Sequence, residues 1–213
     1  MVISLKRSGS TFVASLLNSH FQIMCFPFEV LHPQGVLKTA GLSDYEAVNC
    51  IHNMRGYRAT GMKLIWGQHL LVPEMYWRTR EVKCIRVVRR SHVAAIISEK
   101  TALATRCWHS LDPPPLSTMV FNATVRERKQ REEDEAAMEE WLAKLGMPTM
   151  TIVYENVLPH LRVVDGITYL DRSISEEWLT FLDSDHILTS EPLKTELKRI
   201  SPRLPQSTAP SHA

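Results

Sequence analysis

Residues 1–20 read MVISLKRSGSTFVASLLNSH, and this stretch decides the fold of the chain. Val2, Ile3 and Leu5 form a short apolar run that is typical of a buried strand. After a turn of small and basic residues, apolar side chains recur at helical spacing. The stretch therefore predicts a strand, a tight turn and a helix in direct succession.

The turn consists of six residues, Lys6, Arg7, Ser8, Gly9, Ser10 and Thr11. The first N–H groups of a helix have no partner within it and lie at the positive end of its dipole. Glycine lets the backbone approach a ligand closely, the hydroxyls add donors, and the basic side chains add positive charge. The turn therefore predicts a binding site for phosphate or sulfate.

This turn differs from an ATP-binding Walker A loop. A Walker A loop places Lys and then Ser or Thr after its second glycine, so that they reach the terminal phosphates and magnesium. Here a single glycine follows the basic residues. The pattern favours a nucleotide without a magnesium-bound triphosphate. A solvated turn with incidental basic residues is the alternative.

Composition describes an ordinary globular protein. The chain has 213 residues, 44% of them hydrophobic and 23% charged, with a formal net charge of +2. This composition excludes a disordered chain, and the charge is too small to predict a nucleic-acid partner. We expect one domain over residues 1–200 and a disordered Pro/Ser-rich tail over residues 201–213.

The sequence contains no apolar segment near the roughly 20 residues of a membrane span. A strand from residue 2 leaves no room for a signal peptide, so we expect a cytoplasmic protein. Four cysteines, Cys25, Cys50, Cys84 and Cys107, form no C-x-x-C pair. We expect buried thiols in a reducing compartment rather than disulfides or metal ligands.

Apolar runs and helical periodicities alternate along the chain. Strands are predicted over residues 22–26, 59–65, 82–88 and 149–153, and helices over residues 44–54, 68–78, 91–105, 125–145 and 173–182. The last helix is expected to begin with a capping box at Ser173 and Glu176. This order predicts an α/β fold with a P-loop NTPase-like parallel sheet and helices on both faces. Ligands of such sheets bind at the carboxyl ends of the strands.

Two further features bear on function. Arg90 lies at the exit of the strand predicted over residues 82–88, and Ser98 follows two helical turns later. A guanidinium and a hydroxyl are a suitable pair for one phosphate dianion. By contrast, the mixed-sign run over residues 126–135 is typical of a solvated helix face, not of a nucleic-acid site.

The opening turn together with Arg90 and Ser98 resembles the two nucleotide-binding motifs of sulfotransferases that use 3′-phosphoadenosine 5′-phosphosulfate (PAPS). The resemblance implies that residues 6–11 hold the 5′-phosphosulfate and that Arg90 and Ser98 hold the 3′-phosphate. Additional motifs resemble the bacterial trehalose and Nod-factor sulfotransferases, a carbohydrate-sulfating group. These motifs are Pro27-x-Glu29, residues 61–68 (GMKLIWGQ), Trp108 and residues 154–158 (YENVL).

Sulfuryl transfer to an alcohol requires positioning, stabilisation of the leaving group and a base. Arg7 and the N–H groups of residues 9–11 can stabilise the leaving oxygen, and Lys6 can assist. The resemblance implies Glu29 as the base, PAPS as donor, adenosine 3′,5′-bisphosphate (PAP) as product, and a carbohydrate, glycolipid or small alcohol as acceptor. His20, His32, His69 and His109 are alternative bases, none of which lies at a match to the histidine motif of the cytosolic sulfotransferases. No metal is expected, because no histidine pair has the spacing of a zinc site and the chemistry needs none.

Two rival functions stay open at the level of sequence. One is a P-loop kinase or nucleotide hydrolase, against which the lack of Gly-Lys-Ser/Thr argues. The other is a nucleotide-binding relic of the fold without turnover. The oligomeric state is also open, with a homodimer among the alternatives.

Overall fold

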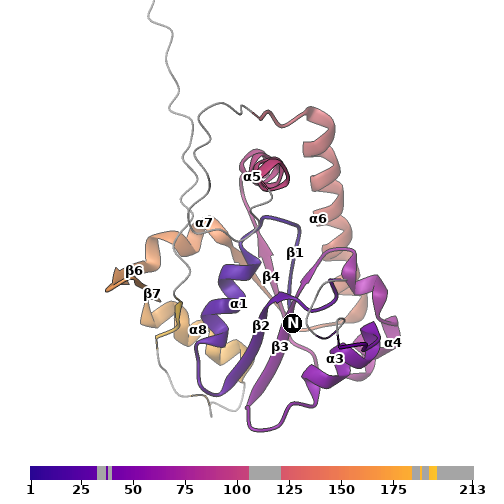
Figure 1. Ribbon diagram of the computed structural model, residues 1–213, viewed down its shortest axis with the longest axis vertical. Helices are drawn as coiled ribbons and strands as arrows, with labels where there is room; N and C mark the ends of the chain where they lie inside the picture. Colours follow the sequence, from indigo (N-terminus) through magenta and orange to yellow (C-terminus); the bar gives the residue numbers. More distant parts are fainter. Residues whose placement is uncertain (33–36, 38–39, 106–120, 184–187, 189–191, 196–213) are drawn as a thin grey trace, which may run out of the picture.

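The computed structural model describes residues 1–32, 37, 40–105, 121–183, 188 and 192–195. Its centre is a five-stranded sheet in the order β2-β3-β1-β4-β5, with every neighbouring pair parallel (Figure 1). The strands are β1 Val2–Ser4, β2 Ile23–Glu29, β3 Ala59–Ile65, β4 Cys84–Val88 and β5 Thr149–Val153. The expected parallel α/β sheet is confirmed.

Helices cover both faces of this sheet (Figure 1). One hydrophobic core lies against α1, α7 and α8, and the other against α3, α4 and α6. The helices are α1 Ser10–Asn18, α3 Asp44–His52, α4 Glu74–Thr79, α5 His92–Thr105, α6 Val125–Leu145, α7 Tyr154–Val157 and α8 Arg172–Leu182, with short 3-10 helices η1 Gln68–Leu71 and η2 Leu158–His160. Within the described ranges, no helix is long and apolar enough to cross a bilayer.

The two cores explain why apolar residues occupy consecutive positions in the central strands. Val2 of β1 packs into the core against α1, whereas its neighbour Ile3 packs into the core against α3. In β4, Ile85 packs into the core against α1, and its neighbour Cys84 packs into the core against α3. Because successive side chains of a strand point to opposite faces, a sheet covered on both faces requires apolar residues at consecutive positions.

The connections that follow β1 and β4 diverge at the carboxyl ends of these two strands. The chain leaves β1 through α1 toward β2 at one edge of the sheet, and leaves β4 through α5 and α6 toward β5 at the other. Parallel sheets bind ligands where neighbouring connections diverge in this way. In Figure 1, α5 lies above this end of the sheet.

The single helix predicted over residues 68–78 is wrong. The chain forms η1, then Val72 and Pro73 in extended conformations, and only then α4. Proline lacks an N–H and restricts the preceding residue to extended conformations. Pro73 therefore divides the segment.

The capping box expected at Ser173 is also wrong, although the helix ends near the predicted position. Helix α8 begins at Arg172, with Asp171 as its N-cap. Ser175 is buried, and its hydroxyl accepts a hydrogen bond from the N–H of Leu193 at 3.1 Å. The helix starts earlier because the carbonyl of Asp171 already accepts the N–H of Ser175 at 3.0 Å, which is its first helical hydrogen bond.

A second, antiparallel sheet, which was not predicted from the sequence, consists of β6 Leu161–Val164, β7 Ile167–Leu170 and β8 Lys194–Thr195. Asp165 and Gly166, with φ of 49° and 79°, form the turn between β6 and β7. Asp-Gly between apolar runs is a strong hairpin signal, so this element was predictable.

The cysteines only partly follow the prediction. Cys25 and Cys84 are buried free thiols in strands, and burial raises their pKa to about 11 and about 12. Cys50 is exposed on α3, contrary to expectation. Cys107 and the tail over residues 201–213 lie outside the described residues.

Candidate anion-binding site

The loop between β1 and α1, residues 5–9, turns sharply at two positions. Gly9 is the N-cap of α1 with φ of 93°, and Arg7 has φ of 60°, which is unusual for a residue with a side chain. A Cβ atom on Gly9 would lie 2.2 Å from Cδ2 of the Tyr154 ring. Glycine is therefore required here both by its φ and by the adjoining ring.

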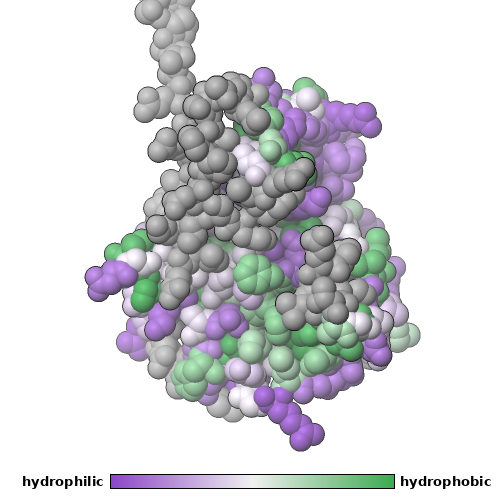
Figure 2. Space-filling view, in the orientation of Figure 1, coloured by the Kyte–Doolittle hydropathy of each residue, from purple (hydrophilic) through white to green (hydrophobic). Residues whose placement is uncertain are grey.

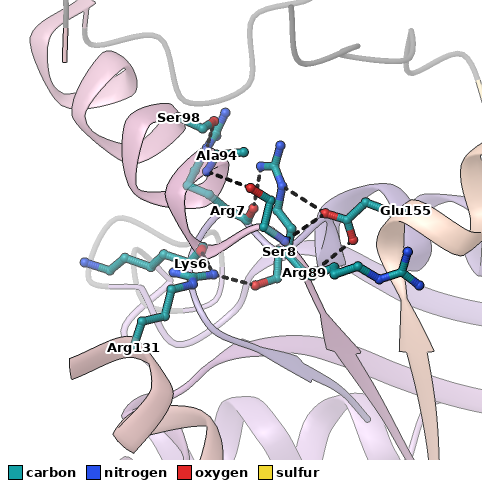
Figure 3. Close-up of polar contacts among 10 residues, drawn as sticks. Lys6, Arg7, Ser8, Arg89, Ala94, Ser98, Arg131 and Glu155 are labelled. Carbon is teal, nitrogen blue, oxygen red and sulfur yellow. Dashed lines mark hydrogen bonds and ion pairs between the residues drawn. The ribbon is translucent and has the colours of Figure 1, made fainter. Parts of the chain in front are cut away.

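Arg7 links this loop to helix α5. Its Nε donates to Oγ of Ser98 at 2.9 Å (Figure 3). Burial, followed by the charge of Arg89, lowers the pKa of Arg7, although a guanidinium stays charged at physiological pH. The structure thus brings together two predicted site residues that are 91 positions apart.

Arg90 lies at the exit of β4, with its side chain directed to α7. Its NH2 donates to Oδ1 of Asn156 at 2.7 Å. The N–H groups of Arg90 and Ser91 donate to the Glu155 carboxylate at 2.9 and 3.3 Å, which fixes the start of α5. The shared role of Arg90 and Ser98 in holding a phosphate stays a prediction.

The neighbouring Arg89 contacts the loop directly. It is 8% exposed, and its NH1 donates to the carbonyl oxygen of Arg7 at 3.0 Å. Its Nε is buried without a hydrogen-bond partner and lies 3.8 Å from a Glu155 oxygen. Burial lowers the pKa of Arg89. Arg90, but not Arg89, was predicted as a site residue.

Arg131 approaches the loop from α6. Its side chain is 6% exposed, and its NH2 donates to the carbonyl of Lys6 and to Oγ of Ser8, both at 2.8 Å (Figure 3). Hydrophilic side chains do cover the visible face of α6 (Figure 2). The prediction of a solvated face is nevertheless wrong at Arg131. Its spacing from the buried Met138 and Leu142 is the signal that places it inward.

Lys63 of β3 connects the loop region to Glu29. It is 2% exposed, and its Nζ lies 2.9 Å from Oγ1 of Thr11 and 3.4 Å from Oε1 of Glu29. Burial lowers the pKa of Lys63, and the neighbouring carboxylate partly opposes this effect. The ammonium therefore bridges the first turn of α1 and the carboxylate.

Glu29 ends a strand that is longer than predicted. Its pairing register with β3 shifts after Phe26, which sets Glu29 opposite Lys63. The Nε2 of Gln68 donates to Oε2 of Glu29 at 3.2 Å, while Oε1 of Gln68 accepts the N–H of Ile65 at 2.8 Å. The carboxylate is thus held on two sides. Lys63 and Gln68 belong to a quoted motif but were not predicted as site residues.

The remaining loop side chains have different positions. Lys6 is exposed, with Nζ 3.4 Å from Glu99. Ser8 and Ser10 are buried, and the hydroxyl of Ser4 donates to that of Ser10 at 2.8 Å. The two predicted hydroxyl donors, Ser10 and Thr11, thus each accept a hydrogen bond within the protein, and each keeps its own O–H as a donor.

The alternative bases are placed less favourably than Glu29. His20 is buried before β2, at the amino end of the strand. Burial lowers the pKa of His69 to about 4, and its Nδ1 already accepts the N–H of Gly67 at 3.3 Å. The N–H of His32 donates to the carbonyl of Glu29, so this residue stays nearby. His109 and Trp108 lie outside the described residues. Among those described, no group of three His, Cys, Asp or Glu residues could hold a metal ion.

Four positively charged side chains, one on the loop and three from other parts of the fold, therefore lie close to this loop. Arg7 comes from the loop, Lys63 from β3, Arg89 from beyond β4, and Arg131 from α6. Carboxylates partly balance this charge, at Glu29, Glu99 and Glu155. Partly buried cations beside a helix N-terminus favour an anionic ligand.

Comparison with known proteins adds no family to this description. No protein-family model matches the chain, and no curated protein matches it significantly.

Proposed function

We propose that the protein is a sulfotransferase that moves the sulfuryl group of PAPS to a hydroxyl of a carbohydrate, a glycolipid or a small alcohol. One observation carries the proposal. Lys63 Nζ lies between Thr11, at the start of α1, and the carboxylate of Glu29. A group able to take a proton therefore lies next to a loop suited to an anion.

The loop and α1 would hold the 5′-phosphosulfate, with Arg7 supplying charge and residues 9–11 supplying N–H groups. Arg90 and Ser98 would hold the 3′-phosphate. A P-loop-like fold agrees with the strand order and with the position of the loop at the carboxyl end of β1. The sulfotransferase motifs quoted above supply the identity of the nucleotide.

In the proposed reaction, the acceptor oxygen attacks sulfur, and the bond between sulfur and the bridging phosphate oxygen breaks. The acceptor proton moves to Glu29, and PAP leaves. Arg7 and the loop N–H groups stabilise the charge that develops on the leaving oxygen. Lys63, whose Nζ lies 3.4 Å from Oε1 of Glu29, would hold the carboxylate in position for this step.

Calorimetric titration with PAP, ATP plus magnesium, and AMP tests the donor. We expect micromolar binding of PAP alone. Arg90→Ala and Ser98→Ala should each weaken it by roughly 1.5–3 kcal/mol, as expected for hydrogen bonds to a charged group. Preference for ATP with magnesium would indicate a kinase or hydrolase. No binding by the folded protein would indicate a relic.

Glu29→Gln tests the base. Turnover should fall by about 100-fold or more, the contribution expected from a general base, while PAP affinity changes little. Glu81→Gln, which alters an exposed carboxylate before β4, is the control and should retain wild-type turnover. Full turnover in Glu29→Gln would remove Glu29 from this role and favour His32.

A further inference from the structure

The guanidinium groups of two buried arginines donate hydrogen bonds to consecutive backbone carbonyl groups of the β1–α1 loop. Arg131 NH2 donates to the oxygen of Lys6 at 2.8 Å, and Arg89 NH1 donates to the oxygen of Arg7 at 3.0 Å. We propose that these arginines, here called the arginine clamp, are positioning residues that fix the loop peptides for anion binding. The inference rests on the proposed function only in that PAP is used as the ligand in its test.

The geometry of the peptide bond gives the clamp its effect. In a planar trans peptide, the C=O and N–H groups point in opposite directions. A donor on the carbonyl of Lys6 therefore directs the N–H of Arg7 to the other side of the loop, and a donor on the carbonyl of Arg7 does the same for the N–H of Ser8. If either peptide flipped, a carbonyl oxygen would face an anion and repel it.

The loop needs such support because of its backbone conformation. Arg7 has φ of 60° and Gly9 has φ of 93°. Left-handed residues near right-handed ones can form a concave array of N–H groups that suits an anion. A residue with a side chain adopts this conformation only when its surroundings enforce it. The Arg89 contact is made at the carbonyl of Arg7 itself.

Simple packing does not account for a buried arginine on α6. Arg131 shares its helix face with Met138 and Leu142, where an apolar side chain would avoid the cost of burying charge. Its Nε has no hydrogen-bond partner, so the burial is incompletely compensated. The hydrogen bonds from its NH2 to Lys6 and Ser8 indicate that the buried guanidinium holds the loop in place.

Hydrogen–deuterium exchange of the loop, together with PAP titration, tests the clamp in Arg131→Met, Arg131→Lys and Arg128→Met. Arg128 is exposed on the same helix and serves as the matched control. In Arg131→Met, we expect faster exchange confined to residues 6–11 and PAP affinity reduced about tenfold or more, the size expected for a lost charged donor. Arg131→Lys should recover part of the affinity, and Arg128→Met should match wild type.

Wild-type exchange in the loop of folded Arg131→Met would overturn the proposal. Acceleration spread evenly over the sheet and α6 would also overturn it, because it indicates general destabilisation. If Arg131→Met does not fold, Arg131→Lys is judged by the same criteria. If wild-type protein fails to bind PAP, the proposed function fails, while the exchange comparison still decides whether the clamp exists.

Discussion

At the scale of single residues, Gly9 is the most constrained position of the candidate site. Its φ of 93° belongs to the left-handed region, and the Tyr154 ring occupies the space where a side chain would begin. Tyr154 in turn packs edge-on against Phe12 of α1, with ring centroids 6.2 Å apart. The ring therefore fixes the loop and the helix together.

Gly9→Ala should destabilise the protein by two separable effects. The left-handed backbone costs about 1–2 kcal/mol for alanine, and the clash with Tyr154 adds about 1–3 kcal/mol of overpacking. Gly56→Ala is the control, because Gly56 has φ of 91° with open space around it. Urea unfolding should show the larger loss for Gly9→Ala. Equal losses would mean that the ring moves aside freely.

Part of the candidate site was predicted from the sequence. The residues that were not predicted make contacts between positions far apart in the chain. The loop, Ser98 and Glu29 follow from strand exits and motifs, which are local signals. The contacts of Arg131 with Lys6 and of Lys63 with Thr11 span 125 and 52 positions. Such contacts depend on how elements pack, and a single sequence shows this only indirectly.

At the scale of elements, α6 is the helix whose ends are most clearly encoded. Thr124 and Glu127 form a complete capping box, and Gly146 ends the helix with φ of 64°. Hydrogen bonds from Lys100 and then from Thr124 lower the pKa of Glu127 to about 2. The start of α6 is thus tied to α5, and Arg131 lies less than two turns inside it.

Thr124→Ala should therefore affect both stability and the loop. Loss of an N-cap costs about 1 kcal/mol, which urea unfolding measures. Ser43→Ala removes the equivalent cap of α3 and provides the comparison. Both variants should lose similar stability, but only Thr124→Ala should accelerate hydrogen exchange in the β1–α1 loop. Equal loop exchange in the two variants would separate the start of α6 from the clamp.

Some regular elements were predictable from local signals. Residues 59–65, 125–145 and 149–153 have the predicted bounds, and Gly146 ends the helix as expected. Predictions failed where another local signal was given too little weight. Pro73 divided one helix, and the hairpin turn at Asp165 and Gly166 was overlooked.

At the scale of the whole molecule, the buried His69 and the partly buried His52 couple stability to pH. Burial lowers the pKa of His52 and of His69 to about 4. His52 stacks on Tyr76 and bonds to its hydroxyl, while His69 stacks on Trp66. Both imidazoles are neutral in the folded protein but take up protons near pH 6.5 once unfolded.

Stability should therefore fall as the pH decreases from about 6.5 to 4. A lowered pKa means that the unfolded chain binds more protons in this window, so the free energy of unfolding decreases by at most about 1.4 kcal/mol per pH unit for each histidine. Urea unfolding at several pH values measures the slope. His52→Gln and His69→Gln should each flatten it, and an unchanged slope in both would refute the assignment.

The irregular end of β2 has a consequence beyond the position of Glu29. In the described sheet, β2 is an outer strand, and it combines Pro27 with a shift in pairing register. Proline and local bends are features by which natural sheets prevent a foreign strand from joining their edge. The distortion that sets Glu29 opposite Lys63 therefore also disfavours the pairing of a foreign strand with the β2 edge of the sheet.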